Sequence, residues 1–184
     1  MRFAVRGLLL GAICCAWGAE PVVVDFESAV PIAPDHSANR VEKWEEKGVV
    51  FTLARAPQTT KGKGMLMFFT HLSNGHKGIL CAMATEPIPV RATFPKVASS
   101  VTVSFWGSTG TPAVLEAFDE GGKVVDRSAL VSVPGRKSPG EPVPIFTMTV
   151  KAPRIAYVQF SGPREGEFLA ADEVRFTPAD GEGK

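Results

Sequence analysis

Asp172 is the charged residue whose place in the sequence is most informative. In a strand, residues two positions apart face the same side, and the residues in phase with Asp172 are apolar. They are Phe168, Ala170, Val174 and Phe176. The carboxyl group is therefore expected on the dry side, where it is costly unless it is paired, hydrogen-bonded or bound to a metal. One interpretation is a structural calcium site, built from carboxylate and carbonyl oxygens. The other is a carboxylate that bonds the backbone, Arg154 or Arg175.

Two tryptophans are the candidate contacts for a sugar. Trp106 shares its strand face with Thr102 and Ser104, so we expect this face to be wet. An exposed indole can stack on the apolar face of a sugar ring while neighbouring hydroxyl groups bind its polar groups. The alternative is that Trp106 packs against a loop or the second sheet. Trp44 lies among charged residues, and it can likewise either contact a sugar or pack at the edge of the sandwich.

Enzymatic chemistry has little support in the sequence. Glycoside hydrolysis needs two carboxylates across a cleft, and adjacent residues of a strand face opposite sides. The pairs of adjacent acids are therefore not catalytic pairs in themselves. They are Glu45/Glu46, Asp119/Glu120 and Asp172/Glu173. The sequence contains no Gly-x-Ser-x-Gly, phosphate-loop or HExxH motif, so we expect a protein that is not an enzyme.

His71 and His76 flank the turn dipeptide Asn74-Gly75. Two histidines beside one turn could help to bind zinc, but no third ligand follows at a recognisable spacing. We therefore expect a turn exposed to solvent.

Short strands must position these residues, because period-2 alternation and turn signals recur along the chain. The clearest stretch is 100–128, where residues 108–110 separate two strands and residues 119–122 form a tight turn to a third. Residues 40–47 are the one segment with helix-forming content. Residues 129–133 are expected to extend the third strand of this stretch, and further strands are expected at 21–26, 48–53, 65–69, 77–83, 88–94, 145–150, 154–160 and 168–176. This pattern predicts an all-β, antiparallel two-sheet sandwich of jelly-roll type, with about ten strands and at most one short helix.

The first 18 residues read as a signal peptide. Met1–Arg6 carries two arginines, Gly7–Trp17 is apolar, and small residues follow at the expected cleavage site. The apolar run is short for a membrane span, which is the alternative. We therefore expect a secreted or periplasmic protein, with a sandwich domain over residues 19–177 and a polar tail over residues 178–184.

Charge gives no indication of nucleic-acid binding. The predicted cleavage removes two of the 20 basic residues and none of the 19 acidic ones, which leaves a net charge near −1. Affinity for nucleic acid depends on clustered basic residues that neutralise phosphates. The expected partner is therefore a carbohydrate or a surface protein, with no membrane span after cleavage.

Several phrases together carry a resemblance to a known group of proteins. They are VVVDFES at 22–28, GVVF at 48–51, SVTVSFWG at 100–107, AVLEAFDEGGKVV at 113–125, RIAYVQFSG at 154–162 and FLAADEVRF at 168–176. In this order they resemble secreted bacterial β-sandwich (jelly-roll) domains related to galactose-binding-like and carbohydrate-binding modules. The resemblance implies that the opening strand pairs with the closing one. It also implies a structural calcium held by Asp25, Glu27, Asp172 and loop carbonyls.

The resulting expectation is a secreted, non-catalytic binding module for carbohydrate, with calcium as a candidate structural ion. The first alternative is a protein-interaction or envelope-structural domain, and a remote one is a glycoside hydrolase or lyase of the same fold. An exposed Trp106 beside a groove would favour sugar. A flat apolar patch would favour a protein partner, and two facing carboxylates would favour an enzyme.

Overall fold

The computed structural model describes residues 19–29, 40–56, 65–71, 75–82, 88–161 and 169–179. Within these ranges the chain forms twelve strands, all paired antiparallel, and no helix. The strands are β1 Val22–Val24, β2 Arg40–Val41, β3 Trp44–Glu46, β4 Val49–Leu53, β5 Met65–Thr70, β6 Lys77–Ala82, β7 Val90–Gly107, β8 Pro112–Phe118, β9 Val124–Arg127, β10 Val131–Ser132, β11 Phe146–Ser161 and β12 Leu169–Pro178. The predicted all-β antiparallel sandwich is confirmed.

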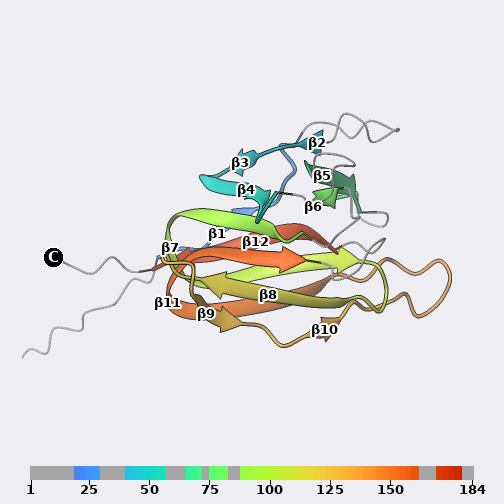
Figure 1. The fold of residues 1–184 in the computed structure, drawn as a ribbon. Coiled ribbons are helices and arrows are strands. Elements are labelled where there is room, and N and C mark those ends of the chain that lie inside the picture. Colours follow the sequence, from blue (N-terminus) through green and yellow to red (C-terminus); the bar gives the residue numbers. More distant parts are fainter. Residues whose placement is uncertain are drawn as a thin grey trace, which may run out of the picture.

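Two long strands organise the sandwich. β7 and β11 pair with each other along most of their lengths and curl around the same end of the molecule (Figure 1). Each therefore contributes one half to each layer, so the two layers belong to one hydrogen-bonded sheet folded over on itself.

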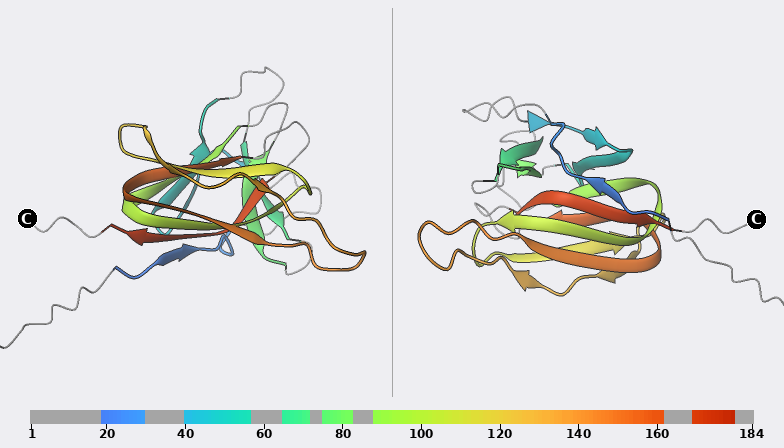
Figure 2. Two further views of the ribbon diagram at one scale, coloured as in Figure 1. Left: turned by 90° about the horizontal axis from the view of Figure 1, so that it is seen from below. Right: turned by 180° about the vertical axis from the view of Figure 1, so that it is seen from behind.

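The strands that flank these two define the layers (Figure 2). In what we call the β12 layer, the second half of β7 pairs with β12, which also pairs with β1 and β6, and β5 and β2 continue outward from β6. In the β8 layer, the first half of β7 pairs with β4 and the second half of β11 pairs with β8. There β3 pairs with β4, while β9 and β10 both pair with β8.

Prolines account for the place where the long strands bend. Pro95 lies in the middle of β7, and Pro153 lies in β11 where the pairing register shifts between Lys151 and Ile155. A proline has no N–H to donate to the ladder, so it interrupts regular pairing. In β7 the inward-facing residues change from even-numbered before the bend to odd-numbered after it.

Aromatic contacts between the layers form the centre of the core. Phe105 of the β12 layer meets Phe160 of the β8 layer edge to face, with ring centroids 5.2 Å apart. Phe94 and Phe176 meet from opposite layers as a tilted pair, with ring centroids 4.8 Å apart. These four side chains are buried, and burial of large apolar surface is the main stabilising term for such a fold.

Residues 40–47, the segment with helix-forming content, do not form a helix; they form β2, β3 and the turn into β4. Lys47 and Gly48 have φ of 50° and 78°, and two successive positive values are typical of a type I′ hairpin turn. The charged residues that favoured a helix lie instead on an edge hairpin, where charge is common.

Two pairs of predicted strands are single strands in the structure. The predictions at 88–94 and 100–106 both fall in β7, and those at 145–150 and 154–160 both fall in β11. The expected pairing of first and last strands is confirmed, since Val22 lies opposite Phe176. The predicted signal peptide lies outside the described residues. Among the residues that the structure describes, no helix is long and apolar enough to cross a membrane.

Candidate functional site

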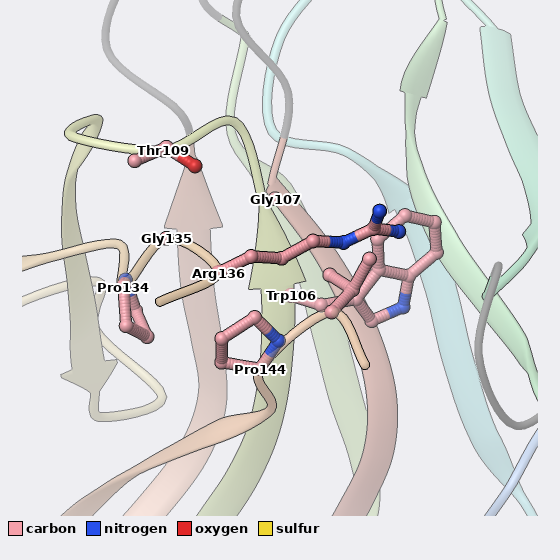
Figure 3. A pocket seen from close by; sticks show the side chains of 8 residues that line it. Trp106, Gly107, Thr109, Pro134, Gly135, Arg136 and Pro144 are labelled. Carbon is pink, nitrogen blue, oxygen red and sulfur yellow. The ribbon is translucent and has the colours of Figure 1, made fainter. Parts of the chain in front are cut away.

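A pocket of about 490 Å³ opens where β7 ends and β11 begins (Figure 3). Its walls come from the end of β7, the β7–β8 turn and the segment 134–145 that leads from β10 to β11, which we call the strap. The lining residues are Trp106, Gly107, Thr109, Pro134, Gly135, Arg136, Val143 and Pro144. This volume lies within the range of small-ligand sites, roughly 300–1,000 Å³.

The strap is held at its start and braced internally. Val133, just before it, accepts from the Gly110 N–H and donates to the Thr111 carbonyl, at 2.9 and 2.8 Å. Further along, Glu141 N–H donates to the Ser138 carbonyl across Pro139-Gly140, where φ of Gly140 is 91°. Proline followed by a glycine with positive φ is typical of a type II turn. The strap also contains four prolines, which limit its backbone freedom.

His71 fastens the far end of the strap. Its Nε2 lies 3.1 Å from the Val143 carbonyl oxygen, and since a carbonyl can only accept, Nε2 carries the proton in this bond. The ring is 2% exposed and meets the Trp106 indole edge to face at 5.0 Å. The expectation of a solvent-exposed turn is therefore wrong for His71, although the side chain of His76 is 61% exposed.

The pocket combines apolar walls with one charge. Trp106 forms its floor and the rings of Pro134 and Pro144 form walls, while Thr109 supplies a hydroxyl group (Figure 3). Of the described residues that line the pocket, Arg136 is the one with an ionisable side chain. Such a site suits a small ligand that has both an apolar face and polar substituents.

The prediction that Trp106 faces water is wrong, and the alternative that it packs against neighbouring elements is correct. Trp106 is 3% exposed because Ala170, Phe69 and Val143 of the strap cover its face of the β12 layer. Thr102 and Ser104, which are half-buried on the same face, do not line the pocket. Thr102 instead bonds Thr149 of the paired strand, with 2.8 Å between the hydroxyl oxygens.

Trp44 also packs rather than standing free. It lies in β3 at the edge of the β8 layer, and its ring meets Phe68 of β5 edge to face at 5.0 Å. Its indole N–H donates to a carboxylate oxygen of Glu46 at 3.4 Å. Trp44 is half-buried, and it closes the sandwich between β3 and β5.

Asp172 is buried as expected, and it lies at a β-bulge. Ala171 lies opposite Phe105 and Glu173 lies opposite Ser104, so Asp172 is an extra residue in β12. It is 7% exposed, and its Oδ1 has no hydrogen-bond partner among the described residues. Its Oδ2 lies 4.0 Å from Nδ1 of His76.

The environment of Asp172 favours its neutral form. Burial raises the pKa of the Asp172 carboxyl above its ordinary value. His76 and His71 lower this pKa, whereas the charges of Glu27 and Glu173 raise it further. Asp172 and Glu27 are thus close enough for their charges to interact.

The proposed calcium ligands do not gather as one set. The Asp25 carboxylate accepts from the Glu27 N–H at 3.3 Å, and Glu27 accepts from the Lys77 N–H at 2.9 Å. The Lys77 ammonium donates to the carbonyls of Glu27 and Ala29 at 2.9 and 2.6 Å, and such oxygens are the type that calcium uses. Within the described ranges, no three His, Cys, Asp or Glu residues are grouped so that they could hold a metal ion. Calcium binding therefore stays a prediction.

An aromatic pair that sequence reasoning did not select lies on the outer face of the β8 layer. Tyr157 and Phe118 are cross-strand neighbours whose rings stack nearly parallel, with centroids 4.8 Å apart. The Arg91 guanidinium lies 4.4 Å from the centroid of the Tyr157 ring. Because the tyrosine ring already contacts both groups, it offers little free surface on which a sugar could stack, and we regard the cluster as structural.

No protein-family model and no curated protein sequence matches this chain. Solved structures with a similar arrangement include the catalytic unit of a GH87 α-1,3-glucanase from Streptomyces thermodiastaticus, with 14% identity and a TM-score of 0.42. This likeness covers 91% of the present chain but 28% of the glucanase unit. The K2 cleaved adhesin domain of Lys-gingipain has 13% identity, a TM-score of 0.41, and 86% and 99% of the two chains covered. The CBM29-2 carbohydrate-binding module has 8% identity and a TM-score of 0.39. This likeness covers 73% of the present chain and 99% of the module. The fold assignment therefore rests on the topology of this chain.

Proposed function

We propose that this protein is a secreted, non-catalytic module that binds carbohydrate in the pocket between Trp106 and the strap. The observation that carries the proposal is the composition of this pocket. The apolar rings of Pro134 and Pro144 lie beside a hydroxyl group and a guanidinium, and Trp106, which is 3% exposed, completes the lining. Sugars present the same combination of apolar C–H faces and polar rims.

The fixed position of the strap supports binding, because a preformed site loses less conformational entropy when a ligand enters. Hydrogen bonds hold the chain at Val133, just before the strap, and at Val143 within it, and the strap contains a tight turn between these points. These contacts hold the proline walls in place.

A binding role fits the pocket better than hydrolysis does. None of the described residues that line it carries a carboxylate, and glycoside hydrolysis requires two. The acids of the β8–β9 turn have other contacts, since Asp119 accepts from the Lys123 N–H at 2.9 Å and Glu120 pairs with Arg154 at 2.8 Å.

A second candidate function is protein interaction, favoured by the segment from β9 to β10. Val124, Val125 and Leu130 are 45%, 36% and 69% exposed within seven residues of sequence. Both strands lie beside β8 at an edge of their layer. Exposed apolar residues near a sheet edge are a common feature of protein contacts.

The test is an array of neutral and acidic oligosaccharides, followed by calorimetry with any ligand that binds. Gly135→Ala should weaken binding by about tenfold or more, because the added Cβ would stand 2.6 Å from Cγ2 of Thr109 and displace the pocket wall. Gly121→Ala, in the turn at the other end of β8, is the matched control and should bind normally. Circular dichroism should show that both variants are folded.

The outcomes separate the two candidate functions. If a glycan binds equally to the Gly135 variant and to the unmodified protein, this pocket is not the binding site. If no saccharide in the array binds, the carbohydrate proposal is wrong and the β9–β10 segment becomes the leading candidate site for a partner.

A further inference from the structure

We propose that the pocket selects an acidic saccharide, one whose ring carries a carboxylate, and that Arg136 pairs with this carboxylate. The inference rests on the proposed function, because it names the class of sugar for the same pocket.

The charge of the pocket carries the inference. Arg136 reaches across the pocket toward Trp106 (Figure 3), and it is the one ionisable side chain among the eight lining residues. Among the described residues, no acid forms a salt bridge with it. The acid of the strap itself, Glu141, accepts from the Lys137 N–H at 3.0 Å and so bonds the backbone. Among the described residues, the lining of the pocket therefore offers a positive charge and no carboxylate.

The chemistry of the guanidinium indicates the kind of anion. Its planar fork of N–H donors matches the two oxygens of a carboxylate, and it stays protonated at any physiological pH. In a uronic acid the carboxylate is attached directly to the sugar ring. One such residue can therefore place its apolar face against the proline walls while its carboxylate meets Arg136.

The experiment is calorimetry of the purified protein with oligogalacturonate, oligoglucuronate and oligomannuronate, each compared with its neutral methyl ester. At least one acid should bind, and its ester should bind at least about tenfold more weakly, because a charge-assisted bond is lost. Arg136→Gln should lower affinity for the acid by a similar factor. Arg136→Lys, which keeps the charge but not the fork, should give an intermediate loss.

Two controls exclude a general effect of charge. Lys137→Gln removes the neighbouring cation of the strap, which does not line the pocket, and should bind the acid as the unmodified protein does. Dextran sulfate, a polyanion without carboxylates, should bind weakly and lose binding as salt is raised.

Each outcome decides the inference. Equal binding of acid and ester, an Arg136→Gln variant that binds as tightly as the unmodified protein, or dextran sulfate binding that matches the uronate would overturn it. Binding of neutral sugars alone would overturn it and leave the proposed function intact. Failure of every saccharide to bind would overturn both.

Discussion

At the scale of single residues, Asp172 is the most unusual group in the described chain. It is buried at a bulge, and one of its oxygens has no hydrogen-bond partner there. A buried acceptor without a partner costs free energy, and more so when it is charged. Bulges of this kind often mark positions that a family retains for a purpose.

Asp172→Asn is expected to raise the melting temperature by a few degrees at neutral pH in EDTA, because it replaces a buried carboxylate with a neutral amide of similar shape. The folded-state pKa is raised above its ordinary value of 3.8, so the native protein loses stability as pH rises from 3.8 through the raised value. Above the raised pKa the full loss of stability from ionising Asp172 is present, and below pH 3.8 this loss is absent. The advantage of the variant should therefore shrink on acidification.

Thermal melts across this pH range test the expectation, with Glu173→Gln as the control for loss of a neighbouring, less buried charge. The neighbouring groups whose charges act on the pKa of Asp172 are His76, His71, Glu27 and Glu173. If Asp172→Asn melts well below the unmodified protein at neutral pH, the Asp172 carboxylate makes a stabilising interaction in the native protein, and the expectation is wrong.

At the scale of elements, the strap depends on a residue that lies far away in sequence. His71 follows β5, yet it bonds Val143 near the start of β11. Among residues close in sequence, nothing indicates this contact, which is why sequence reasoning placed His71 in solvent.

His71→Ala is expected to free the far end of the strap, because it removes the donor to Val143. Trypsin should then cut after Arg136 or Lys137 several-fold faster, since proteolysis follows local opening. His71→Gln, whose amide N–H can approach the position of Nε2, should restore part of the protection. Cleavage rates equal to those of the unmodified protein would mean that the strap does not need this bond.

Two glycines with positive φ form a matched pair, one in the β3–β4 hairpin and one between β5 and β6. Gly48 and Gly75 have φ of 78° and 77°, but a Cβ at Gly48 would stand 3.1 Å from Pro95 while one at Gly75 would meet nothing within 4 Å. Gly75→Ala should therefore cost about 1 kcal/mol from backbone strain alone. Gly48→Ala should cost about 1 kcal/mol more, because the rigid proline ring must shift. Denaturant unfolding measures both, and equal costs would mean that Pro95 yields freely.

At the scale of the whole molecule, the proposed calcium site predicts a dependence of stability on the ion. The melting temperature in millimolar calcium should exceed the melting temperature in EDTA. A ligand that binds the native state at a hundredfold excess over Kd adds about 2.7 kcal/mol to the free energy of unfolding. The shift should disappear in Asp172→Asn. Equal melting temperatures in both buffers would show that the protein does not bind calcium. The Lys77 ammonium would then be the cation that contacts the carbonyls of Glu27 and Ala29.

Local patterns were sufficient to predict the class of fold and most strand positions. Alternation of apolar and polar residues reports which side of a strand is buried, and glycine and proline report turns, because both depend on neighbours within a few residues. The hairpin that includes residues 40–47 was not predicted, because these residues have helical propensity. Two successive positive φ values, at Lys47 and Gly48, turn the chain into a hairpin instead.

Only the tertiary structure decided which side chains form the site. Thr102 and Trp106 share a strand phase, yet Trp106 alone is buried, because Ala170, Phe69 and the strap cover that end of the face. Phe69 and Ala170 are 37 and 64 residues away from Trp106 in sequence, and Val143 of the strap is 37 residues away in a segment without periodicity. Period-2 alternation indicates the side of a sheet that a residue faces, whereas the packing of distant segments decides whether that side is open to solvent.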